Sequence, residues 1–324
     1  MKRTFIFYAA ALCAMLFTGC VVDFIESDII LKDSYVITFD MRGGFLDGPD
    51  EITEQQGRTI ELPRPTYLGY TFAGWYSDPE GEQRFGDENG RYEVQDAVTM
   101  YARWMLKDPD NMVVEGIIYV FVEAGKFTMG CIDGDPDCFT DEVRREVTLS
   151  SFWISKYPIT NRQFGRQVPA NEWDLPAVGI DWEEAALFAD DKGGRLPTEA
   201  QWEFAARGGN VSEDYIYSGS DVLDEVGWYV NNSSGTLWPA GQKLPNELGI
   251  YDMSGNVSEW CHDWYSAYND DAVTNPEGPG EGIGRVTRGG NWQSEAREGR
   301  VTDRAYSDPL ARSNRLGFRI VLKP

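Results

Sequence analysis

The region from about Val113 to Pro324 is rich in Gly, Trp and Asn yet carries few helical patterns, and this restricts the fold more than any other feature. Hydrophobic residues (42%) are abundant enough for a packed core. Helix-start signals stand only at 181–184 (DWEE) and 198–201 (TEAQ), and glycine pairs at 193–194 and 208–209 end these helices. We therefore expect an α+β fold of short strands, two helices and long ordered loops, which commonly carry function.

The charge balance and the single histidine exclude several classes of function. Lys and Arg number 29 against 53 Asp and Glu, a formal net charge of −24, so nucleic acid is not expected as a partner because phosphates need a basic face. His262 is the only histidine, which rules out metal sites built from several imidazoles.

The N-terminus predicts export and lipid anchoring. Lys2 and Arg3 precede an apolar run that is too short to cross a bilayer, so residues 1–19 are expected to be a signal peptide. The run closes on FTGC, which resembles the lipobox of bacterial lipoproteins, so Cys20 would be the lipidated residue; an ordinary secretory signal is the alternative. Residues 20–34 would form a tether. We expect a lipid-anchored protein of the bacterial outer membrane, exposed at the surface.

The remaining cysteines are Cys131, Cys138 and Cys261. Cys131 and Cys138 lie in one loop (CIDGDPDC), so a disulfide is expected in an oxidising compartment, with two free thiols as the alternative. Cys261 is expected to be a buried structural thiol.

A first module extends over residues 35–105. YVITF, RTIELPRP, GYTFAGWYSD and VTMYARW are β-like stretches, and Pro63 and Pro65 suit an edge or a connector. The string from ITFDMRGG to YARW resembles the Listeria–Bacteroides repeat (internalin B-type), a small β-grasp-like module of surface proteins. Trp75 and Trp104 are interpreted as core residues of this module.

A second module extends over residues 113–324. GKFTMG, EVTLSSFWISKYPITNRQF, GGRLPTEAQWEFAARGG, LPNELGIYDMSGNVSEW, RVTRGGNW and LGFRIVL follow in order. Together they resemble the sulfatase-modifying factor family, whose founding activity is formylglycine generation. The resemblance implies an irregular α+β fold related to C-type lectins.

The catalytic residues of that family are not matched here. Founding members use two cysteines, whose soft thiolates hold copper, and the corresponding positions are Ser294 and Gly299. No catalytic residue is therefore assigned, and copper is not expected. A related branch uses iron held by three histidines, which this chain lacks, and His262 is interpreted as structural. Acid–base catalysis by Asp263 or Glu259 is a further alternative, although no nucleophile–base pair is recognisable.

Family members hold calcium at the turn that matches DMSGNVSEW. The equivalent ligands would be the side chains of Asp252 and Glu259 and the carbonyls of Gly255 and Val257, a set of oxygen ligands that suits Ca²⁺. A turn held by hydrogen bonds alone is the alternative. A second family site maps onto Asn232 and Ser234, where the preceding loop is shorter.

The C-terminal stretch is interpreted as a ligand-binding face. In relatives this region lines a substrate groove or a ligand surface, and Arg300, Arg304 and Arg312 stand at framework positions. The candidate ligand-binding residues are Gln293, Ser294, Glu295, Thr302, Tyr306 and Asn314.

The sequence thus predicts a surface lipoprotein whose second domain binds an unidentified protein, peptide or glycan, with calcium supporting the scaffold. A formylglycine-generating-type oxidoreductase and a structural component of a surface assembly are the alternatives.

Overall fold

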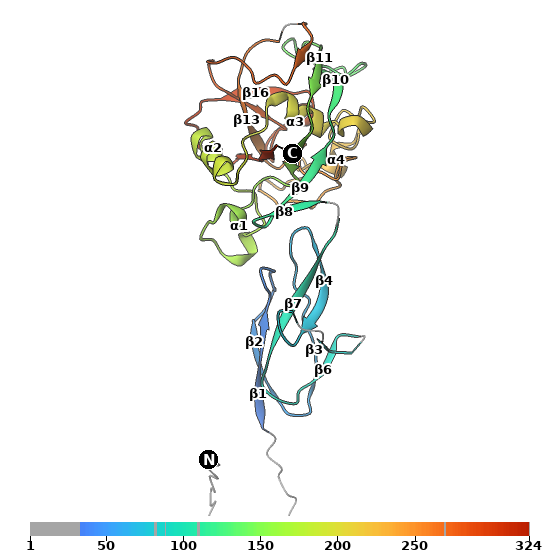
Figure 1. The fold of residues 1–324 in the computed structure, drawn as a ribbon, viewed down its shortest axis with the longest axis vertical. Helices are drawn as coiled ribbons and strands as arrows, with labels where there is room; N and C mark the ends of the chain where they lie inside the picture. Colours follow the sequence, from blue (N-terminus) through green and yellow to red (C-terminus); the bar gives the residue numbers. More distant parts are fainter. Residues whose placement is uncertain (1–32, 81–82, 88, 109–110, 269, 324) are drawn as a thin grey trace, which may run out of the picture.

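The computed structural model describes residues 33–323 except 81–82, 88, 109–110 and 269. The predicted signal peptide, Cys20 and nearly all of the tether lie outside the described residues. The described chain forms two domains that follow one another along the long axis, with β1 at one end and the larger second domain at the other (Figure 1). No helix among the described residues is long and apolar enough to cross a membrane.

The first domain is built from two small sheets. Its strands are β1 (Ser34–Asp40), β2 (Glu51–Gln55), β3 (Thr59–Glu61), β4 (Tyr70–Tyr76), β5 (Arg84–Phe85), β6 (Arg91–Glu93) and β7 (Val98–Leu106). The larger sheet has the order β2-β1-β7-β4-β5, in which β1 and β7 are parallel, and β3 pairs with β6. The four predicted β-like stretches thus coincide with β1, β3, β4 and β7.

The core of the first domain gathers around aromatic residues, as the sequence predicts. Trp75 is 1% exposed, and its indole N–H donates to the carbonyl of Pro63 at 2.8 Å. Trp104 packs against the same cluster and donates to the carbonyl of Met41 at 2.9 Å. Each indole thus buries its rings while its N–H keeps a partner.

The second domain has short strands in three sheets. They are β8 (Met112–Val114), β9 (Ile117–Val122), β10 (Gly125–Met129), β11 (Arg145–Leu149), β12 (Phe152–Ser155), β13 (Ser258–Trp264), β14 (Val273–Thr274), β15 (Arg285–Arg288), β16 (Arg304–Ser307), β17 (Leu316–Phe318) and β18 (Val321–Leu322). The sheet orders are β10-β11-β14, β18-β12-β9-β8 and β16-β15-β13-β17. Strand β16 is an edge of the last sheet.

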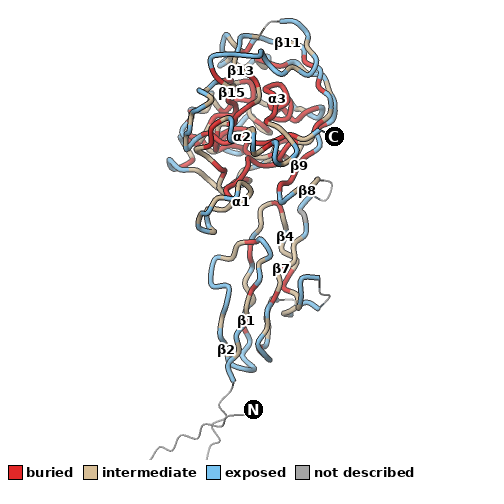
Figure 2. The backbone as a smooth tube through the Cα atoms, turned by 60° about the vertical axis from the view of Figure 1, so that its left-hand side comes forward, coloured by how far each residue is buried: buried red, intermediate tan, exposed pale blue. Residues whose placement is uncertain are grey.

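The helices of the second domain are short. They are α1 (Asn161–Phe164), η1 (Ala170–Glu172), α2 (Trp182–Asp191), α3 (Glu199–Ala206), η2 (Gly209–Val211), α4 (Leu223–Val226) and η3 (Ala296–Gly299). The two predicted helices are α2 and α3. Asp181 caps α2 by accepting from the Glu184 N–H, and Thr198 and Gln201 form a reciprocal capping box at α3. Helix α3 is buried along its whole length, as the red tube in Figure 2 indicates.

The two domains share a packed junction. Leu68 and Tyr70 of the first domain contact a cluster that contains Ile118, Tyr157 and Tyr251 of the second. The two domains approach closely at Gly69 of the first domain (φ +79°). A Cβ added there would lie 2.2 Å from Ile118 Cδ1, so the contact has no room for a side chain. The first domain is therefore joined to the second by contacts as well as by the chain.

Candidate functional site

A groove of about 770 Å³ lies along the edge strand β16, on the sheet β16-β15-β13-β17. All four residues of β16 line it, together with residues of η3 and of the segment before β17. In Figure 1, β16 lies in the upper part of the second domain, far from β1. An edge strand leaves backbone N–H and C=O groups without sheet partners, so the groove offers a hydrogen-bonding edge as well as side chains.

Four of the six predicted ligand-binding residues line this groove: Gln293, Ser294, Glu295 and Tyr306. Tyr306 is 49% exposed, and its ring lies 4.7 Å from that of Tyr265. Gln293 and Glu295 are exposed, whereas Ser294 is nearly buried and its hydroxyl accepts from the Asn291 N–H at 3.1 Å.

The other two predicted residues do not line the groove. Thr302 is 1% exposed, and its hydroxyl accepts from the Arg300 guanidinium at 2.8 Å. Asn314 is exposed, but only its neighbours Ser313 and Arg315 line the groove. The alternation of β16 could not indicate that Thr302 is buried, because this strand starts only at Arg304.

Buried ion pairs between α3 and the sheet support the floor of the groove. Arg304 donates to both carboxylate oxygens of Glu199 at 2.9 and 2.7 Å. Arg288 forms an ion pair with Glu203 and lies 3.3 Å from Glu199. Glu203 also accepts from Arg207 at 3.0 Å. Bidentate pairs of this kind fix the position of a guanidinium, so the strands β15 and β16 are held against α3.

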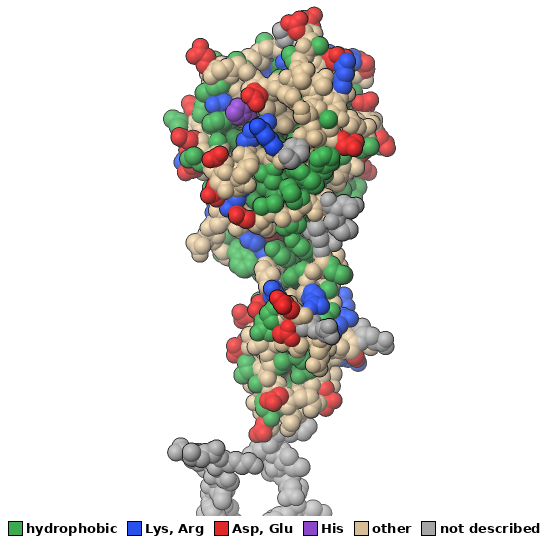
Figure 3. Space-filling view, in the orientation of Figure 1, with side chains coloured by type: hydrophobic (Ala, Val, Ile, Leu, Met, Phe, Trp, Pro, Cys, Tyr) green, Lys and Arg blue, Asp and Glu red, His purple; other side chains and the backbone are tan. Residues whose placement is uncertain are grey.

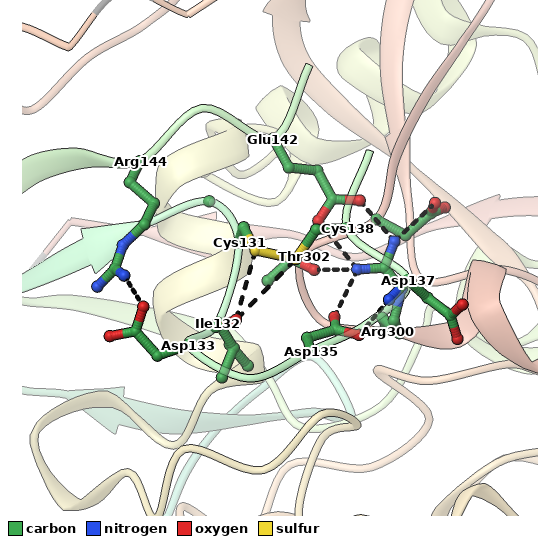
Figure 4. Close-up of a disulfide and its surroundings, with 12 residues drawn as sticks. Cys131, Ile132, Asp133, Asp135, Asp137, Cys138, Glu142, Arg144, Arg300 and Thr302 are labelled. Atoms are coloured by element: carbon green, nitrogen blue, oxygen red, sulfur yellow. Dashed lines mark hydrogen bonds and ion pairs between the residues drawn. A yellow bond between two sulfur atoms is a disulfide. The ribbon is translucent and has the colours of Figure 1, made fainter. Parts of the chain in front are cut away.

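One wall of the groove comes from the loop that carries Cys131 and Cys138, whose sulfur atoms are bonded in the structure. Figure 4 shows this loop around Arg300, which donates to Asp135 at 2.8 Å and to Glu142 at 2.5 and 2.9 Å. Arg300 and both carboxylates are buried. The framework role predicted for Arg300 is thus an ion-pair role.

The disulfide loop supplies groove residues that the sequence did not indicate. Phe139 and Asp141 follow the second cysteine and line the groove, and the Arg297 guanidinium lies 5.4 Å from the ring centre of Phe139. They lie more than 100 residues before the rest of the groove, and only the disulfide loop itself was a signal that this segment is ordered. In Figure 3, acidic side chains (red) are spread widely over the visible face of the molecule.

The groove lacks the side chains of the family's redox chemistry. No cysteine or histidine is among the described residues that line it. Ser294 lies in the groove, whereas Gly299 faces Leu223, whose Cδ atoms would lie 3.3 Å from an added Cβ. Cys261 is buried, and burial raises the pKa of its thiol, so the thiolate is disfavoured.

The titratable groups considered for acid–base catalysis lie outside the groove. Burial raises the pKa of Asp263 to about 7, but its carboxylate accepts from the Glu199 N–H. Burial lowers the pKa of His262, helped by Arg195 and Arg285. Within the groove, burial raises the pKa of Asp303 to about 7 against the opposing effect of Arg288. The described groove residues include no serine paired with a histidine or cysteine.

Of the residues predicted to hold calcium, Glu259 has its carboxylate engaged by other side chains in this arrangement. Both carboxylate oxygens of Glu259 accept from Arg319, at 2.6 and 2.8 Å, and Trp202 donates to one of them at 2.7 Å. Asp252 accepts from the Gly241 N–H, while its Oδ1 is buried without a hydrogen bond to another described residue. Within the described ranges, no group of three or more His, Cys, Asp and Glu is placed to hold a metal.

The second predicted calcium position is also engaged within the protein. The side chain of Asn232 accepts from the Tyr229 N–H at 2.9 Å and donates to Asp224 and to the carbonyl of Gly227. Ser234 lies beside it with a positive φ of 57°. These bonds connect Asn232 to the loop that precedes it.

We expect millimolar calcium to leave the melting temperature of the protein unchanged relative to EDTA. The Arg319 guanidinium already supplies the positive charge beside Glu259, so a divalent ion there would face charge repulsion. Differential scanning fluorimetry in the two buffers checks this, with magnesium as the control ion. A selective rise with calcium would show that the turn rearranges to the predicted ligand set.

Comparison with known proteins agrees with both sequence resemblances. Residues 107–324 match the family described as the sulfatase-modifying factor enzyme 1-like domain, and residues 35–103 match the Listeria-Bacteroides repeat domain. The first match covers more than half of the chain, and the resemblance to each family is thereby confirmed.

Individual relatives have different names and lengths. A serine/threonine-protein kinase pkn1 of Chlamydia pneumoniae is 31% identical over 236 residues, which is 62% of this chain but only 37% of the relative. A formylglycine-generating enzyme of Streptomyces coelicolor is 36% identical over 162 residues, covering 44% of this chain and 51% of the enzyme.

Among solved structures, Treponema denticola variable protein 1 superposes with a TM-score of 0.60 and 26% identity, over 67% of this chain and 100% of that one. The predicted fold class, a small β domain followed by an irregular C-type-lectin-like domain, is confirmed by such neighbours. The chain belongs to the sulfatase-modifying factor enzyme 1-like family and carries a Listeria-Bacteroides repeat ahead of that domain.

Proposed function

We propose that the protein is a lipid-anchored protein of the bacterial cell envelope whose second domain binds a protein, peptide or glycan ligand in the groove along β16. The observation that carries this proposal is the convergence of four residues predicted from the sequence on one groove. The groove combines exposed aromatic, amide and charged side chains with an open strand edge, which suits recognition of a polar ligand.

The arrangement of the two domains supports display of the groove. The chain enters at β1, and the groove lies in the part of the second domain that is distant from β1 (Figure 1). A lipid at Cys20 would place the first domain next to the membrane and leave the groove facing outward. The Listeria-Bacteroides repeat then acts as a spacer between the membrane and the binding domain.

A formylglycine-generating-type oxidoreductase is the second candidate, favoured by the relative from Streptomyces coelicolor. Such an enzyme would act on a protein cysteine, but Ser294 and Gly299 stand at the positions of the family's two cysteines. Serine is a poor ligand for a soft metal, and glycine offers no side chain. Binding without turnover therefore agrees better with the groove.

We expect the groove to be blocked by Ala305→Trp, because Ala305 is exposed on β16 and lines the groove. The immobilised protein is incubated with an envelope fraction of its source cells, and retained molecules are identified by mass spectrometry. A ligand should be retained by the unmodified protein and lost with Ala305→Trp. The matched control is Ala272→Trp, an exposed loop position that does not line the groove.

A turnover assay separates binding from catalysis. A peptide with the sulfatase motif Cys-x-Pro-x-Arg is incubated with the protein, copper and oxygen, and its mass is then measured by mass spectrometry. We expect its cysteine to stay unchanged. Conversion to an aldehyde would establish the oxidoreductase, and equal retention of every molecule by the Ala305→Trp variant would remove the groove as the binding site.

A further inference from the structure

A second cavity, of about 430 Å³, lies between the two domains. It is lined by aromatic side chains from both, with Tyr67, Tyr70 and Trp104 on one side and Tyr157 and Tyr251 on the other. The space-filling view shows hydrophobic side chains at the narrow waist where the domains meet (Figure 3). The volume is within the range of small-molecule sites, and the cavity is remote from β16 and its groove.

The aromatic walls are arranged in pairs. The rings of Tyr67 and Tyr70 are stacked with centroids 4.5 Å apart, and those of Tyr157 and Tyr251 are stacked at 5.1 Å. Trp104 meets Tyr67 edge-on at 5.5 Å. Each ring is therefore fixed by a neighbour, so the cavity has preformed walls.

The cavity is also lined by polar groups that make no hydrogen bond to another described residue. The hydroxyl groups of the four tyrosines make no hydrogen bond to another described residue. Burial raises the pKa of Tyr70, Tyr157 and Tyr251, so these phenols stay protonated and can donate. The exposed amides of two further lining residues, Asn171 and Gln242, are likewise unbonded within the described chain.

The charges at the cavity argue against a cationic ligand. The Arg162 guanidinium lies 5.0 Å from the ring centre of Tyr67, and the Lys156 ammonium lies 5.7 Å from that of Tyr251. Lys107 lines the cavity as well. The one lining carboxylate, Asp174, lies 3.5 Å from Arg162. Cations of the protein itself thus already lie over Tyr67 and Tyr251 and beside Asp174.

We propose that this junction cavity is a second binding site, separate from the groove, for a neutral carbohydrate. A sugar presents C–H faces that pack on aromatic rings and hydroxyl groups that pair with phenols and amides. Both kinds of group are present here, from two domains. Arg162 and Lys156 already pair with Asp174 and Asp108, so neither calls for an anionic ligand. A sugar bound there would also contact both domains and hold them in one relative orientation.

Isothermal titration of the full chain with four neutral oligosaccharides tests this site: cellohexaose, laminarihexaose, mannohexaose and chitohexaose. We expect at least one to bind with a Kd below about 1 mM. The double variant Asn171→Ala/Gln242→Ala should weaken that binding at least tenfold. It should fold normally, because both side chains are exposed and unbonded within the described chain.

Further variants separate this site from the groove. Tyr251→Phe keeps the stacked ring and removes one hydroxyl, so it should weaken sugar binding several-fold without changing the melting temperature. Gln293→Ala, in the groove, should leave sugar binding unchanged. The proposal is overturned if none of the four sugars binds at about 10 mM, or if binding is lost with Gln293→Ala and kept with the double variant.

Discussion

Replacement of Glu203 by Gln is expected to destabilise the second domain strongly. Glu203 is completely buried in α3 and accepts from the Gly130 N–H at 2.8 Å, from Arg207 and from Arg288. Gln keeps the shape but removes the charge that neutralises two buried guanidinium groups.

The expected loss follows from the cost of an uncompensated buried charge. Removing one partner of a buried ion pair costs about 3–5 kcal/mol of the free energy of unfolding. Arg288 is 1% exposed and Arg207 is 8% exposed, so neither can turn to water without moving its strand or helix. The melting temperature of the second domain should fall by roughly 10 °C.

Thermal unfolding followed by circular dichroism measures the change. The matched control is Glu183→Gln on α2, an exposed position at which the same substitution should have almost no effect. Equal melting temperatures for Glu203→Gln and the unmodified protein would show that the buried network does not hold the groove floor.

The buried ion pairs between α3 and the sheet show why the helices could be predicted from the sequence more readily than the groove. Capping signals at Asp181 and Thr198 act between near neighbours in sequence, so the two helices could be read directly. The short strands β13, β15 and β16 give weak periodic signals, and their order depends on pairs such as Arg304 with Glu199, which are 105 residues apart. Pairing over such distances is decided by burial and not by local propensity.

The groove residues differ in the same way: some lie in one stretch of sequence, and others come from a distant loop. Tyr306 and Gln293 could be named because they lie inside a recognisable C-terminal stretch. Phe139 and Asp141 could not be predicted from the sequence, because their position in the groove depends on the contact between Asp135 of the disulfide loop and Arg300. The turn sequence likewise gave no sign that Arg319, 60 residues from Glu259, pairs with both of its carboxylate oxygens.

Removing the disulfide with Cys131→Ser/Cys138→Ser should loosen the groove wall and lower stability less than Glu203→Gln does. The bond closes a loop with a sequence separation of 7, for which the loss of chain entropy in the unfolded state corresponds to about 2–3 kcal/mol. The ion pairs of Arg300 with Asp135 and Glu142 remain in the variant, so the loop should stay attached at that point.

Hydrogen–deuterium exchange locates the loosening. Exchange should rise across residues 131–142 and in η3, since Arg297 of η3 packs on the ring of Phe139, while α2 should be unaffected. A reductant should produce the same change in the unmodified protein and none in the double variant, because Cys261 is the remaining cysteine among the described residues and is a buried thiol already. Unchanged exchange in η3 would mean that the acidic partners of Arg300, and not the disulfide, determine the position of this wall.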